Sequence, residues 1–325
     1  MYSAFSASAP GNLRTFAEFR SRDTCIVADP ATGEYCAVGP GRTQGSDQRS
    51  RRPAIVVYTS KDLRHWSGPR TLFTPEPTFW GATPIRGIWA PEMHHYRGKW
   101  YLFATFDTEE QLAEQWRDWL PRVRRGTQIL VGDSPHGPFR PFAPTATLPA
   151  DMMTLDGTLW VEDDVPYMVF CHEWVQIKNG TVCFVRLKPD LSATDGEPVR
   201  LFEGSDAPWA VKSAQWGCHV TDGPSLVRSK SGKLFLAWSG FGAEGYTTGV
   251  AISDSGKLAG PWRQAPEPLF ADDGGHPFLF RRHDGQLMLA LHSPNKTPNE
   301  RVHLFEVEDT GETLRIIQPF SRPPR

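Results

Sequence analysis

Five stretches of this chain repeat one pattern, and this repetition limits the possible folds more than any other feature of the sequence. Each stretch has a polar or acidic group, a short apolar run, a cluster of Gly, Asp or Lys, and a second apolar run. The stretches begin near residues 22, 89, 155, 221 and 274, at intervals of 67, 66, 66 and 53 residues. Such an internal period is the signature of a chain built from repeated supersecondary units.

Each repeat predicts a four-stranded antiparallel unit. The two apolar runs form its inner strands, and a more polar strand and an outer strand follow, as in "VVYTSKDLRHWSGPRTLF". The 29 Gly and 29 Pro residues punctuate the chain throughout, which favours an all-β protein. We therefore predict a single five-bladed β-propeller over residues 1–325. The period exceeds the usual blade, so we expect an inserted loop at 39–52 and a helix at 108–121.

Composition excludes several classes of partner. The formal net charge is −2 and the isoelectric point is near 6.6, so we expect no nucleic-acid or membrane partner. No run of eighteen apolar residues and no secretory leader is evident, which predicts a cytoplasmic protein. The five cysteines are scattered without C-x-x-C spacing, and we expect them to be reduced and buried in strands.

Acidic residues recur near the start of the repeats. Asp23, Glu92, Asp156 and Asp222 occupy this place in the first four repeats, and His276 occupies it in the fifth. The innermost strand of each propeller blade starts near the central axis, so these side chains are expected to meet at one end of the channel. Carboxyl groups that share a pocket acquire separated pKa values, which suits acid and base catalysis.

The motifs at these positions resemble those of one family. "RD", "WAPE", "LDGTLW", "TDGP" and "GGHPFLF" stand before the five strands in the order typical of glycoside hydrolase family 43. The resemblance spans about residues 20 to 318. It implies a five-bladed propeller that removes arabinofuranosyl or xylosyl units from plant polysaccharides with inversion of configuration.

The resemblance also implies catalytic roles. Asp23 matches the general base that activates water, and Asp156 matches the carboxylate that orients the acid and raises its pKa. Asp222 stands where the family usually has a glutamate as general acid, in a Glu-Gly-Pro context. Because Asp is one methylene shorter, either the backbone lies closer to the sugar or another residue is the acid. Glu173, in "FCHEWV", is the nearest substitute.

Other residues are expected to bind substrate or an ion. Trp89 and Trp174 flank the pocket positions and are candidates for stacking on a sugar. Glu92 and Glu173 are further candidates for substrate contacts. The resemblance implies that His276 points into the channel, where it holds an axial calcium ion or a bridging water. No cofactor is required.

These observations predict an inverting exo-acting hydrolase of oligosaccharide ends, because one end of a propeller channel is closed. Two alternatives remain: a hydrolase of another furanoside, such as a galactofuranoside, and a sugar-binding propeller without activity, which the Asp in place of Glu favours. A fructan-cleaving propeller would carry an Asn-Asp-Pro-like motif near its start, and "SRDTC" differs from it. A protein-binding propeller would not need acids at one place in the repeat.

Overall fold

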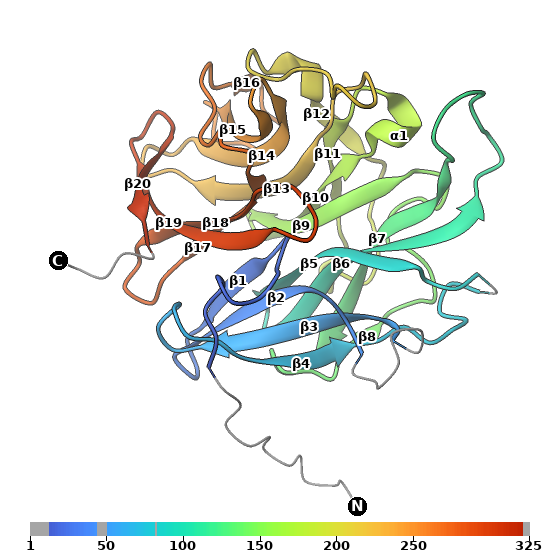
Figure 1. Ribbon diagram of the computed structural model, residues 1–325, viewed down its shortest axis with the longest axis horizontal. Helices are drawn as coiled ribbons and strands as arrows, with labels where there is room; N and C mark the ends of the chain where they lie inside the picture. The colour runs from blue at the N-terminus through green and yellow to red at the C-terminus, as the bar shows by residue number, and fades with distance from the viewer. Residues whose placement is uncertain (1–12, 44–50, 82, 321–325) are drawn as a thin grey trace, which may run out of the picture.

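Five four-stranded antiparallel sheets surround a common axis in the computed structural model (Figure 1). The structure describes residues 13–43, 51–81 and 83–320. In every sheet the strands follow one another in chain order from the axis outward. The all-β fold and the five-bladed propeller predicted from the repeat are confirmed.

The strands of the five blades have the following bounds. The first blade contains β1 (Cys25–Asp29), β2 (Glu34–Arg42), β3 (Pro53–Ser60) and β4 (Ser67–Phe73). The second contains β5 (Gly87–Tyr96), β6 (Lys99–Gln111), β7 (Val123–Gly132) and β8 (Arg140–Pro141). The third contains β9 (Thr154–Glu162), β10 (Val165–His172), β11 (Thr181–Arg186) and β12 (Val199–Glu203). The last two contain β13 (Asp222–Arg228), β14 (Leu234–Gly242), β15 (Gly245–Ser253) and β16 (Trp262–Gln264), then β17 (Gly275–Arg281), β18 (Leu287–Ser293), β19 (Arg301–Asp309) and β20 (Leu314–Pro319).

The innermost strands close the ring. Each contacts the next in the cycle β1, β5, β9, β13, β17, and β17 contacts β1. The segment before β1 also binds the last blade, since the Arg20 Nε lies 3.0 Å from the Glu300 Oε2 and the Arg301 Nε donates to the Ala17 carbonyl at 3.1 Å. The start of the described chain is thereby fixed against its end, and the ring needs no further strand to close.

Every blade places one left-handed residue at the start of its innermost strand. These residues have φ between 41° and 57° and are Asp23, Ala90, Asp156, Gly223 and His276. In the last four blades the pairing with the second strand shifts register at this point. Such bulges re-aim side chains next to functional sites. A Cβ on Gly223 would lie 2.9 Å from the His276 ring, which explains a glycine there.

This geometry corrects the phase expected from the sequence. Asp23, Asp156 and His276 are equivalent residues of their blades, but Asp222 lies one residue before the left-handed position and Glu92 lies two residues after it. A shift of one residue turns a side chain toward a different part of its surroundings. Asp222 and Glu92 therefore do not occupy the position that Asp23, Asp156 and His276 share.

The helix expected at 108–121 is wrong. There β6 continues to Gln111 and β7 begins at Val123, so the segment is a long hairpin joined by a turn. Its apolar residues pack on a neighbouring element instead of on a helical face: Leu112, Leu120 and Val123 contact Val175 and Trp174 in one apolar cluster. Tertiary packing thus overrides the local helical preference. The described residues contain a single α-helix, α1 (Trp174–Ile177).

The insertion expected at 39–52 is shorter than predicted: residues 39–42 belong to β2 and pair with β3, and residues 44–50 are outside the described residues. All five cysteines are free and buried. Four of them lie in strands as expected, whereas Cys218 lies in the segment before β13. Among the described residues, no helix has the length and apolar character needed to cross a membrane.

Candidate active site

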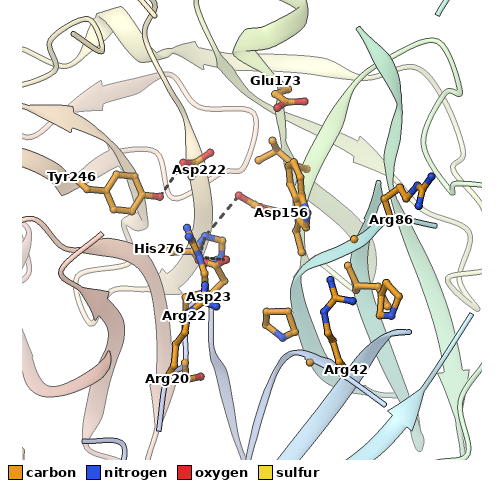
Figure 2. Close-up of a pocket in the computed structure, with 18 of the residues that line it drawn as sticks. Arg20, Arg22, Asp23, Arg42, Arg86, Asp156, Glu173, Asp222, Tyr246 and His276 are labelled. Carbon is orange, nitrogen blue, oxygen red and sulfur yellow. Dashed lines mark hydrogen bonds and ion pairs between the residues drawn. The ribbon is translucent and has the colours of Figure 1, made fainter. Parts of the chain in front are cut away.

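A cavity of about 750 Å³ opens at the end of the axis where the innermost strands begin (Figure 2). It is lined by seven of the eight residues singled out from the sequence: Asp23, Trp89, Asp156, Glu173, Trp174, Asp222 and His276. These residues come from all five blades and lie up to 253 positions apart in the chain. The expectation that they meet at one channel end is met for all of them except Glu92.

Asp23 is held as a carboxylate. The Arg22 Nε lies 3.0 Å from its Oδ2, and the Nδ1 atoms of His276 and His292 lie 3.5 and 3.3 Å from its Oδ1. Burial raises the pKa of Asp23, but His276, Arg22 and His292 outweigh it and lower the pKa to about 2. Because burial lowers the pKa of His276 to about 4, that ring is neutral near pH 6, and Arg22 is the permanent charge beside the carboxylate.

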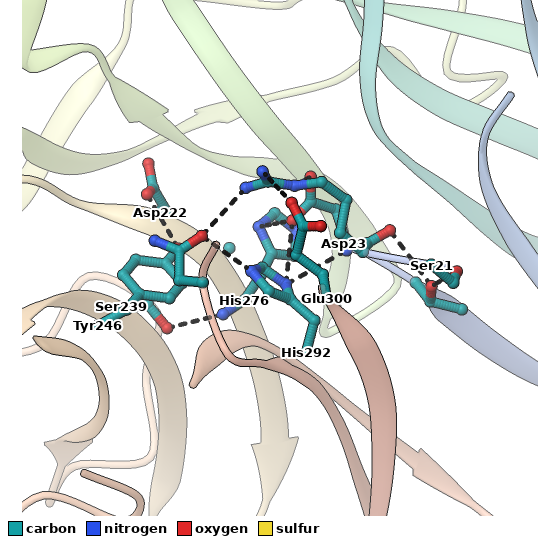
Figure 3. A network of polar contacts seen from close by, with 12 residues as sticks. Ser21, Asp23, Asp222, Ser239, Tyr246, His276, His292 and Glu300 are labelled. Atoms are coloured by element: carbon teal, nitrogen blue, oxygen red, sulfur yellow. Dashed lines mark hydrogen bonds and ion pairs between the residues drawn. The ribbon is translucent and has the colours of Figure 1, made fainter. Parts of the chain in front are cut away.

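A second layer of polar groups fixes these neighbours (Figure 3). The Arg22 Nη1 lies 3.3 Å from the Glu300 Oε1, and the His292 Nε2 lies 3.2 Å from the Asn295 Oδ1. The side chain of Glu300 is fully buried. Arg22 therefore bridges two anions, which orients its guanidinium toward Asp23.

Asp156 and Asp222 favour the protonated state. Burial, and then the charge of Asp222, raises the pKa of Asp156 well above its usual range, although the Gly223 amide donates to its Oδ2 at 2.9 Å. Burial raises the pKa of Asp222 to about 7. The Tyr246 hydroxyl donates to the Asp222 Oδ2 at 2.9 Å and acts in the opposite direction. Asp156 thus holds the backbone beside Asp222, while Tyr246 holds the carboxyl group itself.

Glu173 occupies a different environment. Its two oxygens accept hydrogen bonds from the Arg125 Nη1 at 2.5 and 2.6 Å, and Arg125 also donates to Asp107 at 2.8 Å. Burial raises the pKa of Glu173, while Arg125 lowers it. A carboxylate that neutralises a buried arginine is poorly suited to carry a proton to a leaving group.

Of the two residues expected to bind substrate or an ion near the axis, Glu92 does not line the cavity and His276 does. Glu92 is buried, and its Oε2 lies 2.9 Å from the His94 Nε2. His276 faces Asp23 and Asp156, the latter at 3.8 Å. Within residues 13–43, 51–81 and 83–320, no group of three or more His, Cys, Asp or Glu side chains could hold a metal ion.

The two tryptophans form part of the cavity wall. The Arg125 guanidinium lies 4.0 Å from the centre of the Trp89 ring, so the cation covers one face of the indole. Trp174 lies between Trp119 and Trp216, with ring centres 6.4 and 6.0 Å away. Both indoles are held by neighbours and remain partly exposed in the cavity, as stacking platforms for sugars require.

Sequence reasoning missed four residues that shape this site: Arg22, Tyr246, His292 and Glu300. Arg22 stands next to Asp23, and that adjacency was the available signal. Tyr246 comes from the start of the third strand of its blade, and the other two come from the last blade beyond its innermost strand. Only the pairing of strands brings these three to the axis, so no local motif marks them.

Comparisons with known proteins identify a family and a similar solved structure. A model of the family described as glycosyl hydrolases family 43 matches residues 24–316. A solved structure described as an endo-arabinase from Bacteroides thetaiotaomicron is 36% identical and has a TM-score of 0.77, with 92% of this chain and 98% of that chain covered. The match of the family model begins one residue after Asp23 and contains the other two aspartates.

Two curated relatives are named extracellular exo-α-(1→5)-L-arabinofuranosidases. That of Streptomyces avermitilis is 26% identical and that of Streptomyces chartreusis is 25% identical, each over 60% of this chain. The chain spans 40% and 58% of the length of these relatives. The expectation of a cytoplasmic protein is wrong, because relatives named as extracellular point to secretion. It rested on a leader not being evident, and the start of the printed sequence does not support that conclusion.

Proposed function

Because this chain belongs to glycosyl hydrolase family 43, we propose that it hydrolyses the bond of a terminal α-L-arabinofuranosyl or β-D-xylosyl unit in an oligosaccharide. The observation that carries the proposal is the split between two carboxyl groups of one cavity. The pKa of Asp23 is lowered to about 2 and that of Asp222 is raised to about 7. Between these values the site offers a base and an acid together.

The proposed reaction is a single displacement at the anomeric carbon. Asp23 takes a proton from a water molecule as the water attacks, and Asp222 gives a proton to the departing oxygen. Positive charge develops on the sugar ring in the transition state, and the buried carboxylate of Asp23 stabilises it. The sugar released is inverted at the anomeric carbon, and Asp156 keeps the backbone of the acid in place.

Exo action on an arabinofuranosyl end is the form of the reaction that the relatives favour. The two curated relatives carry exo-arabinofuranosidase in their names, whereas the similar structure is described as an endo-arabinase. The cavity lies at one end of the propeller axis, and we expect this position to favour a chain end. The loops at 40–53 and 107–126 are the remaining candidates for sugar choice, and residues 44–50 of the first lie outside the described residues.

Nitrophenol release from a panel of pentosides and furanosides tests the proposal. We expect the α-L-arabinofuranoside or the β-D-xyloside to be cleaved faster than a galactofuranoside. A second function, sugar binding without hydrolysis, is favoured by the Asp in place of the usual Glu at residue 222. It would be supported if every glycoside of the panel, and a natural disaccharide, bound without being cleaved.

The pH dependence of hydrolysis follows from the acid. Asp222 must be protonated, and its pKa is raised to about 7 by burial, so activity should fall roughly tenfold per pH unit above pH 7. Asp23 stays ionised down to about pH 2, so no acidic limb from the base is expected above pH 4 or so. Initial rates between pH 4 and 9 on a disaccharide measure the alkaline limb and check that no acidic limb appears, and a rate that rises above pH 7 would contradict the assignment.

The Tyr246→Phe variant tests whether the Tyr246 hydroxyl positions the carboxyl group of Asp222. The hydroxyl bond to Asp222 favours the ionised carboxyl, so its loss should raise the pKa and move the alkaline limb to higher pH. The rate on a disaccharide should fall about tenfold, as expected for a lost hydrogen bond to a charged group. Tyr101→Phe is the matched control, because Tyr101 is also buried and its hydroxyl donates to the Asp190 carbonyl. An unchanged limb in the Tyr246 variant would refute this role.

The reaction as proposed needs no cofactor. A calcium ion beside His276 stays a prediction, and no step uses it. Calcium prefers six to eight oxygen ligands, and the side chains around this histidine are two carboxylates and a second imidazole. These side chains alone do not make such a site. Melting temperatures with a chelator and with added calcium would reveal an ion that stabilises the protein.

A further inference from the structure

Four arginine side chains line the active-site cavity, although the proposed hydrolysis uses carboxyl groups. They are Arg20, Arg22, Arg42 and Arg86. Arg20 and Arg22 are both bound to Glu300, at 3.0 and 3.3 Å. The protein's own anions therefore account for these two. Arg42 and Arg86 are left without a role in the reaction.

Arg42 and Arg86 stand at the rim of the cavity, above its floor. Arg42 is the last residue of β2, and Val38 of the same strand pairs with Cys25, the first residue of β1, so β2 extends four residues beyond the start of β1. Arg86 directly precedes β5 in the adjacent blade. Figure 2 shows both arginines on the side of the cavity away from Tyr246.

Among the described residues, no buried carboxylate neutralises the charge of these two arginines. Arg86 lies 2.9 Å from Glu109, but both side chains are more than half exposed, and such a pair opens at little cost. Arg42 donates to the backbone carbonyl of Arg51 at 3.0 Å, and no carboxylate of the described residues lies within ion-pair distance of it. The rim therefore carries positive charge that the described part of the protein does not neutralise.

The carboxyl groups on the floor do not cancel this charge. Asp156 and Asp222 are mainly protonated below pH 7, and Asp23 is paired with Arg22. The remaining carboxylate of the wall, Glu173, is bound by a buried arginine. The acids of the cavity thus leave its rim positive and do not repel an anionic substrate.

The planar guanidinium group has a fork of donors that matches a carboxylate. The sugar to be released lies on the floor, between the base and the acid, so a group at the rim contacts the leaving part of the substrate. We infer that the rim formed by Arg42 and Arg86 binds the carboxylate of a hexuronic acid unit in the leaving group, an inference that rests on the function proposed above. Acidic oligosaccharides that carry a terminal pentose are the preferred substrates.

A matched pair of substrates tests this inference. One is a pentosylated oligosaccharide with a hexuronic acid next to the cleaved bond, and the other is the same molecule after reduction of the carboxyl group to an alcohol. The ratio of their kcat/KM values is the readout. We expect the wild-type enzyme to prefer the acidic substrate by about tenfold or more, mainly through KM. The preference should shrink in high salt, which screens an exposed charge pair.

Variants assign the preference to the rim. Arg42→Gln and Arg86→Gln should each lower the ratio toward one, and Arg42→Lys should keep part of it, because Lys retains the charge and loses the fork. Arg140→Gln is the control: Arg140 is exposed on the outer strand β8, so its loss changes the net charge equally but leaves the ratio unchanged. A wild-type ratio near one, or a ratio that neither glutamine variant lowers, would overturn the inference.

An aryl pentoside separates this inference from the function on which it rests. This substrate has no leaving sugar, so its cleavage by the wild-type enzyme reports the hydrolase alone. If it and both oligosaccharides remain uncleaved, the proposed function fails. Calorimetric titration with the acidic and the reduced oligosaccharide then decides the inference. Tighter binding of the acidic oligosaccharide by the wild type, with this difference lost in the Arg42→Gln variant, would support it. Equal binding of the two oligosaccharides by the wild type would refute it.

Discussion

Replacing Asp23 with asparagine is expected to slow hydrolysis about a thousandfold or more while the fold and substrate binding remain intact. Asparagine has nearly the same shape, but it accepts no proton from water. Asp23 is the cavity carboxyl whose pKa lies far below neutral, so no other described group of the floor is equally ready to act as base. The measurement is kcat on a disaccharide, with the melting temperature and calorimetric binding of the substrate recorded alongside.

The matched control for this variant is Asp29→Asn. Asp29 is also buried and lies at the opposite end of β1, where it accepts from the Ala31 amide and the Thr32 hydroxyl. Its replacement should lower the melting temperature, because two hydrogen bonds are weakened, but should leave kcat close to that of the wild type. Turnover retained in Asp23→Asn would show that another group activates the water.

Replacing Asp222 with alanine should produce a contrast between two substrates. A natural disaccharide has a poor leaving group and should be cleaved a hundredfold to ten-thousandfold more slowly, roughly the contribution of a general acid. An aryl glycoside whose phenolate departs without a proton should be affected much less. The contrast arises because the acid acts only on the leaving oxygen. The contrast is measured as kcat/KM for the disaccharide and the aryl glycoside, with the wild-type enzyme and with the Asp222→Ala variant.

Glu173→Gln is the comparison that decides between the two candidate acids. Glutamine keeps the shape of a side chain that binds the buried Arg125, so it disturbs the cavity less than alanine would. We expect kcat/KM of this variant to fall by a similar factor on the disaccharide and on the aryl glycoside. The contrast appearing in Glu173→Gln instead would make Asp222 a pocket residue and Glu173 the acid.

In the proposed reaction an aspartate acts in place of the family's usual glutamate, and the structure offers a reason why it can. Asp222 lies one residue before the left-handed position that Asp23, Asp156 and His276 occupy in their blades. Its backbone is fixed by the bond from the Gly223 amide to Asp156, and its carboxyl is held by Tyr246. The aspartate side chain is shorter than that of glutamate and extends less far toward the glycosidic oxygen. The fixed backbone and the hydrogen bond from Tyr246 compensate, because they hold the Asp222 carboxyl group in one orientation.

The fold could be predicted from the sequence because the pattern of strands and turns repeats along the chain. Five repeats of alternating apolar runs and turns define five blades regardless of local detail. The helix expected at 108–121 is wrong because Trp116 and Trp119 of this segment pack on Trp174 and Lys178 of the third blade. Local periodicity does not reveal that an insertion buries its apolar side on another blade.

The site could be predicted only in part. The motifs identified Asp23, Asp156 and Asp222, and the structure brings these three together. They did not show that Glu92 turns away from the cavity, because that depends on a bulge of its strand. Tyr246 could not be found either, since the strand pairing that carries it to the acid leaves no trace in the residues around it.

The anomeric configuration of the first product tests the central claim most directly. Proton NMR of an α-L-arabinofuranoside or a β-D-xyloside, recorded during the first turnovers, distinguishes the two anomers before they equilibrate. A water activated by Asp23 on the face opposite the departing group predicts that the inverted sugar appears first. Initial release of the sugar with retained configuration would contradict the account, because it would require a covalent intermediate on one of these carboxylates.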